Sequence, residues 1–193
     1  MFPALILAST SIYRRDLLAR LGVPFDTHSP GVVEDHWDGE PPADRAVRLS
    51  LEKAQAVARR FPNAIVIGSD QVAASGGRIL DKPGNEAVCR QQLAHLSGAT
   101  AHFYTGCAVV GPNAAVIDSH LDITYVVFRS LSEGEIQRYV EKEKPFDCAG
   151  GFKMESLGIT LFERIETIDP TALIGLPLIR VAQALRSAGL ALP

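Results

Sequence analysis

The chain has 193 residues, of which 47% are hydrophobic, so its length suits one domain with a sizeable core and its composition excludes global disorder. The formal net charge is −3, and because binders of nucleic acid polymers are usually basic, duplex DNA and RNA are poor candidates for a partner. No apolar run approaches the roughly 20 residues that span a bilayer, and no signal peptide pattern is present, so we expect no membrane association and a cytoplasmic location.

The three cysteines are far apart in the sequence and form no C-x-x-C pair. We therefore expect neither a zinc or iron–sulfur site nor a disulfide framework. A cysteine in that situation usually packs as a small hydrophobe, so we expect burial for each of them: Cys89, Cys107 and Cys148.

The N-terminal region runs from an apolar tripeptide into three hydroxyl residues and two arginines. Leu5–Leu7 predicts a short buried strand, and the leucines between positions 17 and 21 predict one face of a helix. The hydroxyls at positions 9–11 are favoured where a helix begins, and a helix start exposes unpaired N–H groups with a partial positive charge. With Arg14 and Arg15, this junction is either a simple N-cap with a solvated basic turn or a site for an anion such as phosphate.

The next elements alternate between helix and strand. A loop at residues 36–42 precedes a helix that Asp44 can cap and that runs to about Arg60. The β-branched run Ala64–Gly68 predicts a buried strand that ends in Ser-Asp-Gln. After a Gly-Gly turn, Asn85–Leu96 predicts a capped helix that Gly98 stops.

Two longer strands follow, Ala101–Val110 and Ala115–Phe128, separated by the hairpin signal Gly-Pro-Asn. In the second, the apolar residues from position 117 to 127 fall mainly on odd positions, which predicts a half-buried antiparallel strand. Ser132 with Glu135 predicts a capping box for a helix to about Lys142.

The C-terminal part contains a Gly-Gly turn followed by alternating residues at positions 152–155, which predict a strand with one polar face. Gly158–Glu163 predicts another strand, and Pro177 suits the first turn of a final helix that reaches Ser187. The sum is a mixed α/β domain with helices on a largely antiparallel or mixed sheet. Neither G-x-x-x-x-G-K-[ST] nor G-x-G-x-x-G occurs, so any phosphate would bind at the hydroxyl–arginine junction.

Two charged residues stand in apolar surroundings. Lys53 lies one turn from Leu49 and Val57 on the predicted helix, so it either extends to water from the edge of the core or reaches toward an anion. Asp70 follows directly after a predicted buried strand, where α/β folds place functional groups, although a turn aspartate that bonds to its own backbone would fit the same position.

Other charged residues lie in predicted loops. Lys82 is held in an extended conformation by the proline that follows it, and Glu34 with Asp35 supplies two more carboxylates. Lys153 and Glu155 alternate with apolar residues and could form either a surface pair or the wall of a pocket. Each could simply be solvated, but together they give the cations and carboxylates that metal-assisted chemistry on a polyphosphate requires.

Seven segments together resemble the Maf family of nucleoside triphosphate pyrophosphatases, in order and spacing from the first strand to the last helix. They resemble most the 7-methyl-GTP pyrophosphatase branch, which has SDQV after the central strand and FK-x-E later. Ile12 stands where the family usually has proline, and Tyr13 where close members of the branch can carry tryptophan. The segments are LILASTSIYRRDLLARLG, EKAQAVA, IGSDQV, DKPGNEA, FYTG, CAGGFKMESLGITLFERIE and LIGLPL.

The resemblance implies one Maf domain over residues 1–193, in one piece or as two lobes, with an elongated mixed sheet, flanking helices and a deep cleft similar to inosine triphosphatase-like proteins. It also implies hydrolysis between the α- and β-phosphates, with a divalent cation, Mg²⁺ or Mn²⁺, and a homodimer in many members. The substrate implied is 7-methyl-GTP. The alternatives are a pyrophosphatase for dTTP, UTP or another modified nucleotide, and a nucleotide-binding regulator of cell division.

The resemblance also assigns roles to single residues. Asp70 matches the proton acceptor. Lys53 and Lys82 match phosphate-handling positions and count with Asp70 as catalytic, and Glu34 with Asp70 matches the carboxylates near the metal. A methylated guanine is a delocalised cation, so a flat aromatic side chain can stack on it and a carboxylate can pair with its N1–H and N2–H edge. The positions that match substrate binding are Ser9, Arg14 and Arg15 for the phosphates and Tyr13, Gln71 and Glu155 for the base.

Overall fold

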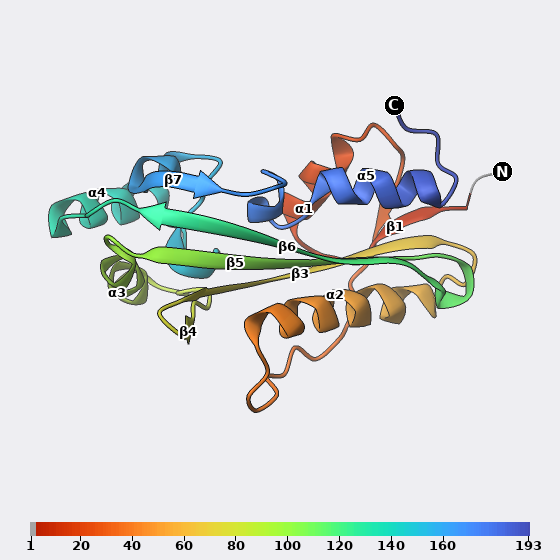
Figure 1. Cartoon of the computed structure of the whole chain (residues 1–193), viewed down its shortest axis with the longest axis horizontal. Helices are drawn as coiled ribbons and strands as arrows, with labels where there is room; N and C mark the ends of the chain where they lie inside the picture. The colour runs from red at the N-terminus through yellow and green to blue at the C-terminus, as the bar shows by residue number, and fades with distance from the viewer. Residues whose placement is uncertain (1–2) are drawn as a thin grey trace. The chain divides into compact units, whose positions relative to one another are not determined.

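The computed structural model describes residues 3–193, which form one mixed sheet with helices packed on it (Figure 1). The strand order is β2-β1-β3-β5-β6-β7, and β4 pairs with β3. β1 is parallel to β2 and β3, whereas β4 is antiparallel to β3 and β7 to β6, so the predicted mixed α/β class is confirmed. The strands are β1 Leu5–Leu7, β2 Asp26–Thr27, β3 Ile65–Ser75, β4 Arg78–Ile79, β5 Thr100–Val110, β6 Val116–Phe128 and β7 Phe162–Glu166.

Five α-helices and four short 3₁₀ turns lie within the described residues. No helix among residues 3–193 is long and apolar enough to cross a membrane. The helices are α1 Ile12–Ala19, α2 Pro42–Ala58, α3 Glu86–Leu96, α4 Glu133–Glu143 and α5 Leu178–Ser187, and the turns are η1 Pro112–Ala114, η2 Ala149–Gly151, η3 Leu157–Leu161 and η4 Ala172–Ile174.

The chain divides into two compact units, and strands β3, β5 and β6 contribute residues to both. The first unit comprises the described residues up to Gln71 together with Thr105–Asp122 and Asp169–Pro193. The second comprises Val72–Tyr104 and Ile123–Ile168. A single Maf domain with a deep cleft remains a prediction.

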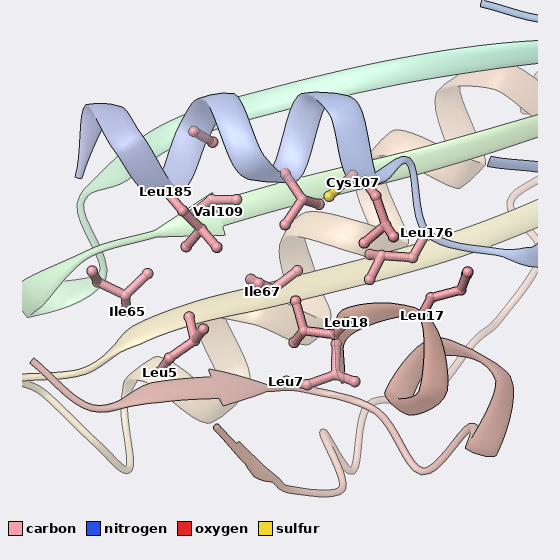
Figure 2. Packing of buried hydrophobic residues seen from close by; sticks show 13 residues of the cluster. Leu5, Leu7, Leu17, Leu18, Ile65, Ile67, Cys107, Val109, Leu176 and Leu185 are labelled. Carbon is pink, nitrogen blue, oxygen red and sulfur yellow. The ribbon is translucent and has the colours of Figure 1, made fainter. Parts of the chain in front are cut away.

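The first unit has a hydrophobic layer on each face of its strands, because successive side chains of a strand point to opposite faces. On one face, Leu5 and Leu7 of β1 and Ile67 of β3 pack with leucines of α1 and α5 (Figure 2). On the other face, Ile6 and Val66 pack with Ala54 and neighbouring residues of α2. The predicted strand Leu5–Leu7 and the leucine face of the first helix are therefore confirmed.

The second unit has an aromatic core. Phe103, Phe128, Phe152 and Phe162 pack edge to face, with ring centroids 5.0–5.4 Å apart. Edge-to-face pairs of this kind add to the stabilisation that comes from area burial alone.

The cysteine environments partly match the prediction. Cys89 and Cys107 are buried, and burial raises the pKa of Cys89 to about 11 and that of Cys107 to about 12. These two thiols are therefore neutral packing groups. Cys148 is only half-buried, so its predicted burial is wrong: it lies in the predicted turn, directly before η2, where its side chain is partly open to solvent.

Most of the predicted helix caps are confirmed. Asn85 accepts a hydrogen bond from the amide of Val88 at 3.0 Å, and Ser132 with Glu135 forms the capping box of α4. The backbone and side-chain hydrogen bonds from Ser132, with the Arg129 ion pair, lower the pKa of Glu135 to about 2. The cap of α2 is different, since Pro41 precedes the helix and Asp44 lies inside its first turn.

The two strand predictions in the C-terminal half are wrong in whole or in part. Residues 152 and 153 have no regular structure and residues 154–156 form a turn, so the first strand is absent. Gly158 lies in η3, so the second strand begins only at Phe162. The reason is a tight backbone approach, because a Cβ on Gly158 would lie 2.2 Å from the carbonyl oxygen of Lys153. Apolar alternation alone does not reveal such a compact turn.

The buried face of β6 also differs from its sequence pattern. Asp122 and Thr124 are 3% and 0% exposed, whereas Tyr125 is 38% exposed. The hydroxyls of Thr124 and Thr167 lie 2.9 Å apart, so hydrogen bonding compensates the burial of this polar side chain. The hairpin itself is confirmed, since β5 and β6 are neighbours joined through η1.

Candidate functional site

Two glycines allow α2 to lie directly on the sheet of the first unit. A Cβ on Gly68 of β3 would lie 2.2 Å from the carbonyl oxygen of Ser50, and a Cβ on Gly106 of β5 would lie 2.1 Å from that of Ala46. Real side chains do not approach backbone atoms so closely, so only glycine fits at either position. One face of α2 is thereby held against β3 and β5.

This close approach brings Lys53 to Asp70. Lys53 lies on the same side of α2 as Ser50, three residues further along, and Asp70 lies two residues beyond Gly68 on the same face of β3. The Lys53 Nζ donates a hydrogen bond to Asp70 Oδ1 at 2.6 Å. The prediction that Asp70 ends its strand is wrong: β3 continues to Ser75 because the polar side chains after Gly68 find partners within the fold.

A third charge joins this pair. Lys53 Nζ also lies 2.7 Å from Glu34 Oε1. The side chains of Lys53 and Asp70 are only 7% and 9% exposed, whereas that of Glu34 is 52% exposed. Lys53 therefore does not extend to water; it contacts two carboxylates of the chain itself, and a contact with a bound anion stays a prediction. Because desolvation offsets much of the attraction in a buried ion pair, stability is a weak explanation for this arrangement and chemistry is a better one.

The strand–helix junction near the N-terminus is a true helix cap. Ser11 is the N-cap residue and its Oγ accepts a hydrogen bond from the Arg14 amide at 3.4 Å. Ser9 is 6% exposed and its Oγ accepts from the Ser11 amide at 3.1 Å. Arg15 is exposed and pairs with Asp16 at 3.0 Å. The N-cap is thus confirmed, and Arg15 is solvated as that interpretation expects, whereas Arg14 is not. Anion binding at this helix start stays a prediction.

Arg14 points back into the unit instead of into solvent. Its Nε donates a hydrogen bond to the carbonyl oxygen of Gly175 at 2.9 Å. Burial lowers the pKa of the Arg14 guanidinium, and the negative charges of Asp70 and Glu34 raise it. The guanidinium still remains charged, so the structure brings Arg14 into one electrostatic environment with the Lys53 cluster.

The loop that holds Arg14 is itself fixed by β3. The Ser69 hydroxyl lies 2.8 Å from two acceptors, the carbonyl oxygens of Gly106 and Gly175. The Gln71 amide nitrogen donates to the carbonyls of Ala172 and Leu173 and to Thr105 Oγ1, at 3.0–3.1 Å. These bonds tie the loop at residues 172–175 to the strand that carries Asp70.

The same loop is capped by a buried aspartate. Asp169 is 2% exposed; its Oδ1 accepts from the amide and hydroxyl of Thr171 at 2.9 and 2.6 Å, and its Oδ2 accepts from the Ile179 amide at 2.7 Å. The same Thr171 hydroxyl oxygen lies 2.9 Å from the Leu176 carbonyl oxygen, a second acceptor for its one hydrogen. Sequence reasoning missed Ser69, Asp169 and Thr171, although the pattern Asp-x-Thr before a proline-started helix is a local capping signal.

The remaining predicted site residues are placed as follows. Tyr13 is half-buried in α1 of the first unit. Lys82 and Glu155 belong to the second unit and are exposed there. Lys153 Nζ lies 3.8 Å from Asp147 Oδ1, so the possible pair with Glu155 is not the contact observed. The roles of Tyr13, Lys82 and Glu155 stay predictions.

The predicted site for a divalent cation consists of the carboxylates of Glu34 and Asp70. Within residues 3–193, no group of three or more His, Cys, Asp or Glu side chains is arranged to hold a metal ion. Glu34 and Asp70 nevertheless converge on one point, the Lys53 ammonium. Since Mg²⁺ is commonly held by one or two carboxylates together with substrate phosphates, these two residues fit such a cation.

The sequence of the whole chain is similar to those of known proteins. Residues 4–188 match the family model described as Maf-like protein. The chain is 52% identical over 193 residues to a 7-methyl-GTP pyrophosphatase from Xanthomonas oryzae pv. oryzae, covering 100% of both chains. It is also 52% identical over 192 residues to a 7-methyl-GTP pyrophosphatase from Aromatoleum aromaticum, covering 100% of this chain and 99% of that one.

The fold also occurs among solved structures. The Staphylococcus aureus Ham1 protein superimposes with a TM-score of 0.51 at 13% identity, covering 97% of this chain and 100% of that one. At this identity the similarity shows the fold alone.

Proposed function

The chain belongs to the Maf-like protein family, and from this membership and the Lys53 cluster we propose that it hydrolyses 7-methyl-GTP to 7-methyl-GMP and pyrophosphate. Relatives 52% identical over the whole chain carry that activity in their names. The observation that carries the proposal is the buried ammonium of Lys53 between Asp70 at 2.6 Å and Glu34 at 2.7 Å. Such a cluster suits a reaction in which negative charge must be held and a proton removed.

Asp70 is the residue that handles the proton. Lys53 engages its Oδ1 and so restricts the rotation of the carboxylate, and Oδ2 accepts a proton from the water that attacks the α-phosphorus. Burial of the pair keeps bulk water from competing for the same hydrogen bonds.

In the first unit, positive charge for the phosphates comes from Arg14 and Lys53; for Lys82 the same role is proposed from the family resemblance alone. The bond from Arg14 Nε to the Gly175 carbonyl leaves the two terminal nitrogens of the guanidinium for a bidentate contact with phosphate oxygens. Ser9 and Arg15 lie on either side of the α1 N-cap, where backbone N–H groups favour an anion. Together these groups would stabilise the charge on the leaving pyrophosphate.

Glu34 and Asp70 would hold the divalent cation, Mg²⁺ or Mn²⁺. A cation bound there would polarise the phosphoryl oxygens and lower the charge that the protein itself must neutralise. Lys53, which now lies between the two carboxylates, would then share them with the cation and keep both oriented.

The base contacts are the finer part of the proposal. The Gln71 amide nitrogen already donates to the loop at residues 172–173. The side-chain oxygen of Gln71 is left to contact the base, and it can accept a hydrogen bond from N1–H or N2–H of the guanine. Tyr13 offers an aromatic face for the cationic 7-methylguanine ring. Glu155 would pair with the same donor edge of the base.

The setting of this activity is also proposed. The substrate is a free nucleotide, so we place the protein in the cytoplasm and assign it neither a nucleic acid polymer nor a membrane as partner. A homodimer is proposed from the family resemblance, and the molar mass in solution, measured by light scattering, tests it.

The test is pyrophosphate release by the purified protein with Mg²⁺ or Mn²⁺ from 7-methyl-GTP, GTP, dTTP, UTP and CTP. We expect the highest kcat/KM for 7-methyl-GTP and its loss in Asp70→Asn, which keeps the size of the side chain. Preference for dTTP or UTP would refute the base assignment alone. Tight nucleotide binding without turnover would refute the catalytic proposal and favour a regulatory protein.

A further inference from the structure

The loop that carries Glu34 is attached to α2 by two arginines. Arg45 Nη2 donates to the carbonyl oxygen of Glu34 at 3.2 Å, and Arg48 Nη2 donates to that of Asp35 at 3.1 Å. Both arginines belong to the helix that also carries Lys53. The loop is therefore held to one helix through its backbone and, by the Lys53–Glu34 contact, through its side chain.

Arg48 is the centre of this attachment. Its Nε and Nη2 contact Glu40 Oε1 and Oε2 at 2.5 and 2.7 Å, a bidentate pair, and its Nη1 lies 3.3 Å from Glu52. The guanidinium carbon lies 3.9 Å from the centre of the Trp37 ring. Bidentate pairing and stacking both depend on the planar guanidinium, which lysine cannot reproduce.

The burial of these groups separates them from ordinary surface pairs. The side chains of Arg48 and Glu40 are 14% and 8% exposed, although the loop residues around them are largely exposed. Trp37 is 59% exposed and covers the guanidinium with one face of its ring. Exposed ion pairs contribute little, but a largely buried, bidentate and stacked pair can fix a loop conformation.

The position of the Glu34 carboxylate depends on how the backbone of its loop is held. Glu34 lies in an irregular segment between β2 and α2, and its side chain is 52% exposed. A carboxylate on a loop loses conformational freedom when it is held at one point, so its time-averaged position depends on how firmly the backbone beside it is fixed.

We propose that Arg48 is a positioning residue that holds the Glu34 loop, through the Asp35 carbonyl, Glu40 and Trp37, so that the Glu34 carboxylate stays at the Lys53–Asp70 pair. The catalytic part of this inference rests on the proposed function. Arg48 touches neither Asp70 nor Lys53 in the contacts above and acts through Glu34.

Trp37 supplies a readout that does not depend on activity, since it is the only tryptophan in the sequence. Acrylamide quenching of its fluorescence is compared in wild type, Arg48→Ala and the matched control Arg59→Ala, an exposed arginine at the end of the same helix. We expect the quenching constant to rise toward that of free tryptophan in Arg48→Ala and to stay at the wild-type value in Arg59→Ala. An unchanged constant in Arg48→Ala overturns the proposal.

The second readout is a double-mutant cycle with 7-methyl-GTP. Partners that orient a metal-binding carboxylate typically affect activity by about 10- to 100-fold, so Arg48→Ala should lower kcat/KM by about that factor. In a Glu34→Ala background it should add less than about twofold, because the residue it positions is already gone. An equal loss in both backgrounds would show that Arg48 acts elsewhere and overturns the proposal.

Two controls keep the result interpretable. Arg48→Lys keeps the positive charge but loses the planar guanidinium that makes the bidentate contact. It should therefore change the quenching constant and kcat/KM in the same direction as Arg48→Ala, and it replaces that variant if Arg48→Ala folds poorly. Cooperative thermal unfolding identifies properly folded variants. If wild type releases no pyrophosphate from any nucleotide, the proposed function fails, and the quenching comparison still decides whether Arg48 holds the loop.

Discussion

Gly68→Ala tests whether the contact of α2 with the sheet sets the geometry of the site. The new Cβ would lie 2.2 Å from the carbonyl oxygen of Ser50 and 2.6 Å from the amide nitrogen of Ala54. Both are backbone atoms, so no side-chain rotation relieves the overlap, and α2 must move by about 1 Å to restore ordinary contact distances. Overpacking of this kind costs about 1–3 kcal/mol, and we expect about 3 kcal/mol because the backbone must shift.

The displacement has two measurable effects. A loss of about 3 kcal/mol lowers Tm by about 6–12 °C in a chain of this size. Moving Lys53 by about 1 Å from Asp70 should also lower kcat by about 100-fold, since small misplacements of catalytic groups have effects of that order. Calorimetry gives the first quantity, and pyrophosphate release, measured below the Tm of the variant, gives the second.

Gly134→Ala is the matched control, because its Cβ would meet only the flexible end of Arg138 at 3.3 Å. This glycine lies inside α4, where alanine is favoured by about 0.5–1 kcal/mol, so we expect unchanged activity and an equal or higher Tm. The reasoning would be refuted by a Gly68→Ala variant with wild-type Tm and wild-type kcat.

Three further results are expected. Ser69→Ala should reduce the free energy of unfolding in urea by about 1 kcal/mol, because a buried hydrogen bond is lost, and should raise KM for the nucleotide through a less firmly held Arg14; an unchanged KM would contradict this. Because the folded-state pKa of Glu135, about 2, lies below its ordinary value of 4.5, its stabilisation is present above pH 4.5 and disappears as the pH falls toward 2. Glu135→Gln should therefore show a flatter urea midpoint across that range than wild type. A thiol reagent at pH 8 should modify Cys148 first, with the two buried cysteines reacting only after unfolding; rapid reaction of all three in the native protein would exclude their burial.

The elements with strong local signals could be predicted from sequence. The capping residues Asn85, Ser132 and Glu135 make the predicted hydrogen bonds, because a cap depends only on residues within one turn. The buried strand at Leu5–Leu7 was also predictable, since a short apolar run beside a helix has few other solutions.

Elements decided by distant contacts could not be predicted in this way. β3 continues through Asp70 because Lys53, 17 residues away in sequence, supplies a partner for its carboxylate. β6 buries Thr124 because Thr167 supplies a hydroxyl. In both cases tertiary hydrogen bonds compensate for polarity that a local pattern treats as a boundary or as a solvent-facing position.

Three residues of the candidate site could be predicted from sequence, but the contacts that support them could not, and the roles of all the predicted site residues stay predictions. Lys53, Asp70 and Glu34 were predicted as site residues, and Lys53 contacts both carboxylates. The contacts at Gly68 and Gly106 were not predicted. A glycine inside a strand often marks a close approach of another backbone, but only the tertiary structure shows that this backbone is α2.

The most direct test of the catalytic account is turnover of 7-methyl-GTP in H₂¹⁸O by wild type and Asp70→Asn. If water attacks the α-phosphorus with Asp70 as proton acceptor, the label appears in 7-methyl-GMP, the pyrophosphate is unlabelled, and Asp70→Asn loses turnover while it unfolds cooperatively like wild type. Label in pyrophosphate, release of orthophosphate, or undiminished turnover in Asp70→Asn would contradict the account.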